Sequence, residues 1–559
     1  MTFTRYELTI PVELTSELHI GGVDPVPDRD GEGTVIRFNR NGLKEPTIPG
    51  RSIRGAVRAA CNVLWEERKL KDDPSGVFSE TNWKSLWGDD LAHHEGDSPD
   101  DVLPVRRSAL TFHAVSFPEY KDSDSGESPL PRRHGVGIDR TTGAASDGAL
   151  YEHEFLPRGT KFDIRITAEG RDGEKMGRDQ SDGIPEPASS ESVKKLLEVI
   201  VDVLTSGAVC LGGRTGSGQG TIQVIEPKLR STGKTTDAGA LTAPSDVLDA
   251  LIGEDEEGTP IPLELGGWSL QEPARIRITW WSPTGIFVAE DEKLTKQRKA
   301  QKEAENRKKG IDEEVHEVVY PLRDPSVAWD EAQLLIPGTS IRGALRSRAS
   351  RIARTVLASR DDFERLASHD IHEQIAAEPN LVRYMFGSTN YRGAVTVHDC
   401  LSTDPGKCIE VTHNAIDRWT GGVIDGGLFT EAVYLGTHWE PITIDIDLRQ
   451  LLNNIEAEKG EAKSKPKKAK TKETEQDDQR ESQQREHVYA PYARAAYVLL
   501  GLVLAELSAG TLPLGSRSTR GLGQVVVSTI KVEGAERKGV DLPSWNFTGC
   551  EALQQPATG

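Results

Sequence analysis

Two arginines four residues apart, next to a serine and a glycine, occur twice in the chain. Residues 48–58 read IPGRSIRGAVR and residues 336–346 read IPGTSIRGALR. The Pro-Gly pair predicts a turn, and the serine that follows is a residue type that caps helix N-termini. Arginines four apart on one helix face, beside free backbone N–H groups, can bind a phosphate. The residues expected to do so are Ser52, Arg54, Arg58, Ser340, Arg342 and Arg346.

The same motif also fits an amphipathic helix with a solvated basic face, because Ile53 and Val57 recur at helical spacing. Gly55 and Gly343 fall in the first helical turn, where glycine lowers helix stability. We therefore expect another backbone to approach closely at these two glycines. The repetition of the motif favours phosphate binding over the solvated face.

Two glycine-rich turns, at 210–224 and 512–527, form another repeated pair. The first reads CLGGRTGSGQG and lacks the Lys-Ser/Thr of a P-loop. Successive backbone N–H groups in such turns bind anions, so both turns are predicted to hold phosphate. The residues assigned to this role are Arg214, Gly216, Gly218, Arg517 and Arg520.

A third repeated motif reads IDRTTG from Ile138 and IDRWTGG from Ile416. Its aspartates are either catalytic carboxylates or structural partners that anchor a hairpin. We interpret the aspartates as structural, and we interpret Arg140 and Arg418 as contacts to a nucleic-acid backbone.

These landmarks recur in the same order, which indicates an internal duplication. Each copy reads strand, helix, strand, strands, helix, strand, and this order predicts an α+β fold of two tandem ferredoxin-like, RRM-like domains. A helix with a large charged content, or a disordered loop, is expected near 290–317, and a disordered insertion near 455–486. The predicted parts are a first domain at 1–227, a linker at 228–270, a second domain at 271–534 and a C-terminal tail at 535–559.

The chain has 559 residues and a net charge of -20, which argues against a nucleic-acid partner unless a basic groove is local. Five cysteines without a CxxC pair fit a reducing cytoplasm and argue against a cysteine zinc site. The sequence shows neither a signal-peptide pattern nor an uninterrupted apolar stretch of about 20 residues. We therefore expect a cytoplasmic protein without a membrane span.

Together with LHIGG at Leu18, LYEHE at Leu150 and LFTE at Leu428, these motifs resemble the RAMP superfamily of CRISPR-associated proteins. More narrowly, they are similar to two fused copies of the backbone subunit of type III effector complexes, which act in antiviral defence. The resemblance implies thumb-like hairpin insertions, expected at 141–156 and 420–430. It also implies binding of CRISPR RNA and complementary target RNA, and assembly with other type III effector subunits.

In many such subunits an acidic residue in the loop before IPG cuts the target RNA with a divalent metal, expected to be Mg²⁺. The family's aspartate lies five residues before an arginine. Counting back from Arg37 gives Glu32, with Asp30 and Asp28 close by. These three are the candidate catalytic residues of the first copy, and Glu32 and Asp30 are the candidate metal ligands. A solvated acidic turn is the alternative.

In the second copy, counting back from Arg323 gives Val318, and Glu317 is the adjacent carboxylate that could substitute. The second site is therefore expected to cut weakly or not at all. Because both copies depart from the family pattern, the sequence leaves open whether the chain is an endoribonuclease. The alternatives are an inactive backbone subunit, an endoribonuclease that processes CRISPR precursor RNA, and a tandem scaffold without an RNA partner.

Overall fold

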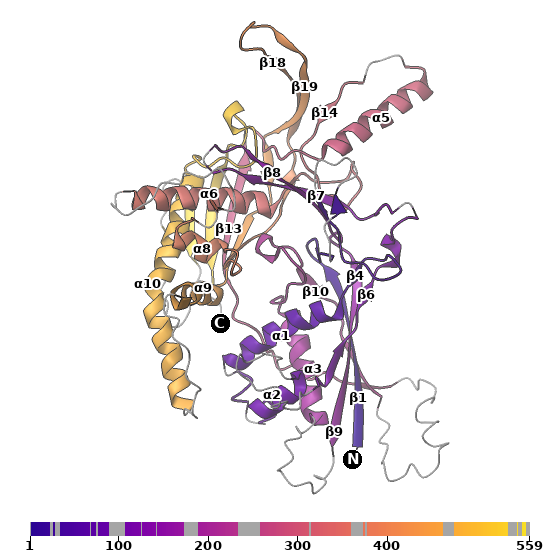
Figure 1. Cartoon of the computed structure of the whole chain (residues 1–559), viewed down its shortest axis with the longest axis vertical. Coiled ribbons are helices and arrows are strands. Elements are labelled where there is room, and N and C mark those ends of the chain that lie inside the picture. The colour runs from indigo at the N-terminus through magenta and orange to yellow at the C-terminus, as the bar shows by residue number, and fades with distance from the viewer. Residues whose placement is uncertain are drawn as a thin grey trace, which may run out of the picture.

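The computed structural model describes most of the chain, and Figure 1 shows its arrangement. The described residues are 2–22, 26–27, 34–67, 69–73, 76–88, 107–124, 126–140, 142–172, 188–232, 258–311, 315–358, 373–374, 377–461, 475–534, 545 and 551–554.

The first domain is built on an antiparallel sheet in which β1 lies between β9 and the strands that end the domain. Five buried side chains of β1, from Tyr6 to Leu14, alternate with less buried ones, as expected for a strand with one covered face. That face packs against two helices, α1 and α3. The elements are β1 (Thr2–Leu14), α1 (Gly50–Glu66), β5 (Leu110–Phe112), β9 (Lys161–Asp172), α3 (Ser190–Thr205) and β10 (Ile222–Val224).

The second domain repeats this plan. Its sheet has the order β22-β13-β21-β16, again antiparallel. The corresponding elements are β13 (Ala274–Ser282), α6 (Gly338–Leu357), β16 (Val395–Val397), β21 (Ile442–Ile446), α10 (Glu475–Ser508) and β22 (Val526–Glu533). Both sheets place the last strand beside the first and the third between the first and second, which is the ferredoxin-like order. The prediction of two tandem α+β domains is confirmed.

Each domain carries a long hairpin. Thumb 1 consists of β7 (Arg132–Ile138), β8 (Ala145–Glu154) and the turn between them. Thumb 2 consists of β18 (Lys407–Ile416), β19 (Val423–Leu435) and their turn. In both, a short strand joins in parallel: β3 (Thr34–Ile36) pairs with β8, and β14 (Val318–Val319) pairs with β19. The hairpins begin earlier in the chain than predicted, because the strand before each IDR motif belongs to them.

The remaining elements lie around these two units. In the first half they are β2 (Val26–Pro27), β4 (Thr47–Ile48), α2 (Glu80–Trp87), β6 (Val115–Ser116), η1 (Pro118–Tyr120) and η3 (Thr215–Ser217). In the second half they are α5 (Glu292–Lys309), β15 (Leu335–Ile336), α8 (Asn380–Phe386), β17 (Cys400–Asp404), β20 (Thr437–Trp439), α9 (Leu448–Glu461) and η4 (Ser518–Arg520).

Regular strands lie within the two segments that the sequence analysis expects to be a linker and a C-terminal tail. The expected linker begins with β11 (Lys228–Thr232), which pairs with β1, and it includes β12 (Thr259–Ile261), which pairs with β11. The expected tail contains β23 (Glu551–Gln554), which pairs with β22. Open edges of a sheet present unpaired N–H and C=O groups, and these strands satisfy them.

The insertion near 290–317 contains helix α5, which projects from the second domain beside thumb 2 in Figure 1. The insertion near 455–486 is not wholly irregular, because its described parts continue α9 and begin α10. Within α10, Val488–Ser508 is long and apolar enough to cross a membrane, but half of it is buried inside the structure. Tyr497, Leu500 and Leu504 belong to the hydrophobic core of the second domain, so this segment behaves as a core helix.

Candidate nucleic-acid interface

The two IPG motifs begin helices α1 and α6, but the serines do not cap them. The N-cap residues are Pro49 and Pro337, neither of which makes a side-chain cap hydrogen bond. Ser52 lies in the first turn, where its N–H donates to the Pro49 carbonyl at 2.9 Å. Ser340 has the same position in α6. The expectation that these serines cap the helices was therefore wrong, because Pro49 and Pro337, in extended conformation, occupy the N-cap positions.

The close backbone approach predicted at Gly55 and Gly343 occurs instead at Gly50 and Gly338. A Cβ on Gly50 would lie 2.0 Å from the Phe112 carbonyl oxygen, and one on Gly338 would lie 2.2 Å from the Val397 oxygen. Apart from the helix itself, no atom of the described residues lies within 4 Å of the equivalent position on Gly55 or Gly343. The helix start is thus packed against the end of the second strand, while the exposed glycine leaves room for a ligand.

Gly338→Ala should lower the free energy of unfolding by about 1–3 kcal/mol, because the added methyl group overlaps a carbonyl that the sheet holds in place. Gly343→Ala is the matched control in the same helix. It should leave stability unchanged or raise it by about 1 kcal/mol, since alanine is the better helix former. Chemical denaturation of both variants checks the pair. Equal stability of the two would contradict the packing described here.

The arginines of the motifs bind the ends of the short helices α2 and α8. Arg54 donates to the Trp87 carbonyl at 2.5 Å, and Arg342 donates to the Phe386 carbonyl at 2.6 Å. Burial lowers the pKa of Arg342 to about 10. Arg346 donates to the Gly387 carbonyl and pairs with buried Glu378. These side chains therefore donate hydrogen bonds to carbonyl groups at the C-terminal ends of α2 and α8. The spacing of arginines in the sequence could not distinguish this arrangement from a solvated basic face. Arg58 is half-buried on the same face of α1.

The first glycine-rich turn packs against the second domain. A Cβ on Gly216 would lie 3.5 Å from the Arg342 guanidinium, and one on Gly218 would lie 2.8 Å from the His398 ring. Arg214, in the left-handed backbone region, stacks over the Tyr151 ring. This turn, for which the sequence predicts phosphate binding, therefore lies at an interface between the two domains.

The second glycine-rich turn is exposed over η4. Arg517 has the same left-handed backbone conformation as Arg214 in the first turn. It donates a hydrogen bond to the buried carboxylate of Glu431 in thumb 2 at 2.8 Å. Arg520 lies 3.5 Å from the other oxygen of Glu431 and over the Phe429 ring. Gly521 has positive φ, and in the described part of the chain only its sequence neighbours lie within 4 Å of the place that a Cβ would take, so this turn keeps an accessible backbone.

The two IDR motifs form the turns at the thumb tips. The Asp139 carboxylate accepts the N–H of Thr142, and the Asp417 carboxylate accepts those of Trp419 and Thr420. Each aspartate thus closes its own turn, as Asx turns do. This geometry agrees with a structural function for both carboxylates.

The neighbouring arginines differ sharply between the thumbs. Arg140 pairs with Glu378, and its backbone N–H donates to Gln374 of the second domain at 2.9 Å. Thumb 1 is therefore docked on the second domain through its tip. Arg418 is exposed, and Trp419 beside it is 98% exposed. The tip of thumb 2 presents the same motif to the outside.

A buried charge cluster that the sequence analysis missed also joins the domains. Arg133 of thumb 1 is 4% exposed and pairs with Glu17 at 2.6 Å and with Asp399 at 3.0 Å. Asp399 also accepts the Gly338 N–H at 2.7 Å, which satisfies the first turn of α6. Burial raises the pKa of Glu17 to about 8, against the opposing effect of the Arg133 charge. The one available sequence signal was an aspartate after His398, where the first copy has alanine after His113.

The first acidic loop falls outside the described residues, and this covers Asp28, Asp30 and Glu32. Glu317 is described and exposed directly before β14. Within the described ranges, Glu317 does not belong to any group of three metal-ligating side chains.

The two arginines used to count register are not equivalent. Gly21 pairs with Phe38 in the first domain, and Ala289 pairs with Pro321 in the second. Two residues beyond these partners lie Arg40 and Arg323, so Arg323 corresponds to Arg40 rather than to Arg37. Sequence counting therefore compared the two acidic loops at different registers. Arg37 and Arg40 both bind Asp122, and they anchor the end of the first loop.

Comparison with known proteins addresses the whole chain. A search of curated proteins found no match. The model of the RAMP superfamily matches residues 12–223 and 334–526, one region in each domain and well over half of the chain together. Proteins of this superfamily are CRISPR-associated, generally bind CRISPR RNA and work in multi-subunit complexes. The chain therefore belongs to the RAMP superfamily and contains two copies of its domain.

Proposed function

We propose that the chain is a two-domain backbone subunit of a type III CRISPR effector complex, which holds guide and target RNA in antiviral defence. The observation that carries the proposal is the contrast between the thumbs. Thumb 1 reaches the second domain through Arg140 and Glu378, whereas the tip of thumb 2 is exposed. Units of this kind can form a repeating stack, because each thumb contacts the next domain along it. Thumb 2 is then available to RNA and to a further subunit.

The exposed parts of the IPG helices and of the second glycine-rich turn support RNA binding. Gly55 and Gly343 leave space beside the N-terminal turns of α1 and α6, where the helix dipole favours an anion. Arg520 and Gly521 add a cation and an accessible backbone in the second domain. These surfaces are local, so the net charge of -20 does not exclude a phosphate backbone as a ligand.

Within this proposal, the first copy cleaves target RNA in the cytoplasm at a kinked nucleotide. A kink brings the 2′-hydroxyl into line with the adjacent phosphate, and a carboxylate of the first loop accepts its proton. Glu32 and Asp30 would hold Mg²⁺, which prefers carboxylate oxygens and stabilises developing charge on the phosphate. The second copy offers one carboxylate, Glu317, at the corresponding strand.

The arginines of the two IDR motifs provide a matched test. Arg418→Ala should weaken guide or target RNA binding and reduce the salt slope of log affinity by roughly 1, the value for one lost phosphate contact. Trp419→Ala should weaken it by about 1–3 kcal/mol if a base stacks on the indole. Arg140→Ala is the control, because that arginine is already paired with Glu378.

RNA titrations at several salt concentrations measure these effects. An unchanged affinity and salt slope in both thumb 2 variants would contradict RNA contact at this tip. A loss in Arg140→Ala equal to that in Arg418→Ala would show that domain docking, rather than direct contact, governs RNA binding.

A catalytically inactive backbone subunit is the second candidate, favoured by the isolated position of Glu317 among the described residues. Both candidates predict that guide-length RNA copurifies with the chain. Target cleavage that a chelator abolishes distinguishes the active subunit from the inactive one.

A further inference from the structure

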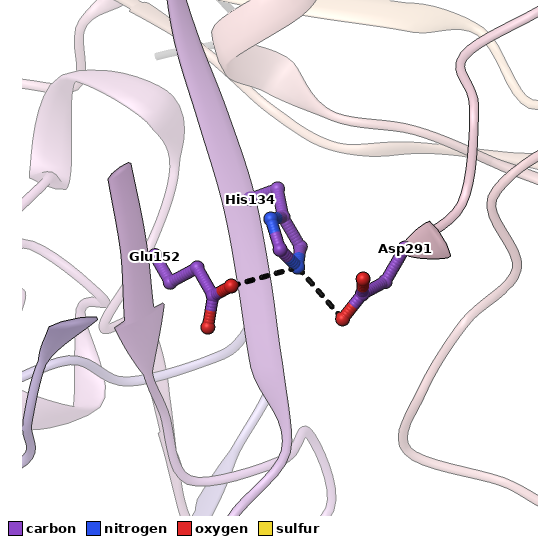
Figure 2. Close-up of side chains that lie close together, drawn as sticks. All are labelled: His134, Glu152 and Asp291. Atoms are coloured by element: carbon purple, nitrogen blue, oxygen red, sulfur yellow. Dashed lines mark ion pairs between the residues drawn. The ribbon is translucent and has the colours of Figure 1, made fainter. Parts of the chain in front are cut away.

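A histidine and two carboxylates from different domains meet at the base of thumb 1 (Figure 2). His134 on β7 and Glu152 on β8 are directly paired across the hairpin. Asp291 comes from the second domain, immediately before α5. Its Oδ2 lies 2.8 Å from His134 Nε2, and Glu152 Oε1 lies 3.5 Å from the same nitrogen. One ligand atom from each residue falls within 4.8 Å of the others.

This donor set is one that transition metals use. Imidazole nitrogen combined with carboxylate oxygen suits Zn²⁺ and its neighbours in the first transition row, whereas Mg²⁺ takes oxygen ligands. Zinc–ligand bonds of about 2.0–2.1 Å at tetrahedral angles separate donor atoms by roughly 3.3 Å. The His134–Glu152 separation already fits this value. Asp291 Oδ2 must move roughly 0.5 Å away from His134 Nε2, and its separation from Glu152, which is within 4.8 Å, must reach the same value.

A neighbouring arginine orients one of the three ligands, and the other two are partly accessible to solvent. Glu152 is buried, and its second oxygen lies 3.4 Å from Arg132, so Oε1 is the atom turned toward His134. An outer partner of this kind orients a metal-binding carboxylate. His134 and Asp291 are half-buried, so an ion can reach them from solvent.

Contacts within the second domain hold the N-terminal end of α5, which we call its root, in place. Arg298 pairs with buried Glu290, and its guanidinium lies 3.4 Å from the centre of the Trp329 ring. Thr295 is also buried and donates to Glu290 at 3.0 Å. These contacts position Asp291, the residue before α5, within the second domain and opposite thumb 1 of the first domain.

We propose that His134, Glu152 and Asp291 bind one divalent transition-metal ion, of which Zn²⁺ is the test case, and that this ion links thumb 1 to the root of α5. The three ligands come from thumb 1 and from the second domain, and none of them is a carboxylate of the acidic loop of the first copy. A bound ion would hold together two segments that lie more than a hundred residues apart in the chain.

The test uses the full-length, untagged protein freed of metal and RNA. After equilibration with Zn²⁺, bound metal is measured by elemental analysis and affinity by competition with a chromophoric chelator. We expect one equivalent per chain. His134→Ala, Glu152→Gln and Asp291→Asn should each weaken Zn²⁺ binding by at least about tenfold. Substitution of a residue that only supports a metal ligand already costs about tenfold in affinity, and loss of a ligand should cost no less. His113→Ala is the control, because this exposed histidine bonds to Thr167 and does not belong to the three-ligand cluster.

Three results would overturn the proposal. The first is wild-type protein that retains no Zn²⁺, which would show that the cluster is an imidazolium ion pair only. The second is equal affinity in wild type, His134→Ala and Asp291→Asn. Since a variant could lose metal by misfolding, circular dichroism accompanies each measurement. Co²⁺ absorption in the wild type gives a second readout, and an all-oxygen, six-coordinate spectrum would also refute the site. These readouts require neither RNA nor cleavage, so they are independent of the proposed function.

Discussion

Replacing Arg133 with alanine should lower the free energy of unfolding by about 3–5 kcal/mol, the usual cost of removing one partner of a buried ion pair. Arg133 is 4% exposed and lies between Glu17 of the first domain and Asp399 of the second. Its loss leaves the buried carboxyl group of Glu17 and the half-buried carboxylate of Asp399 without their cation. Because Asp399 also caps α6, the effect should extend to the first turn of that helix.

Chemical denaturation followed by tryptophan fluorescence and circular dichroism measures the change. If Arg133 joins the domains, the variant should unfold in two separate transitions, since uncoupled domains lose joint cooperativity. Arg165→Ala is the matched control, because this exposed arginine is 3.9 Å from Asp163 on the same domain. It should change stability by no more than about 0.5 kcal/mol. A similar small change in Arg133→Ala would show that the cluster contributes little.

Removing Glu32 and Asp30 together should reduce target-RNA cleavage opposite the first copy by about a hundredfold or more, the usual cost of losing a general base. Glu317→Ala provides the comparison in the second copy. That variant should leave cleavage opposite the first copy unchanged, because Glu317 lies beside thumb 2 rather than in the first loop.

The measurement maps cut positions on a labelled target RNA in the presence of Mg²⁺. Single variants then separate the contributions of Glu32, Asp30 and Asp28. Persistent cleavage opposite the first copy in the double variant would refute the assignment of these carboxylates. Strong cleavage opposite the second copy that depends on Glu317 would instead identify an active second site.

The duplication, the strand and helix order and the two thumb motifs could be predicted from the sequence, because each is local in the chain. Alternating apolar residues mark β1, and helical spacing marks α1 and α6. The turn chemistry of the IDR motifs likewise depends on an aspartate and the next few N–H groups. Such features need no distant partner, so repeated motifs were sufficient to identify the family.

Tertiary structure decided which polar residues are available to a ligand. Arg140 and Arg418 share a motif, yet one is paired with Glu378 and the other is exposed. Gly218 and Gly521 occupy matching turns, yet only the first packs against His398. The joining of His134 with Asp291 crosses the two domains. In each case the deciding partner lies far away in the chain, and burial and desolvation there determine whether a charged group stabilises the protein or remains free to bind another molecule.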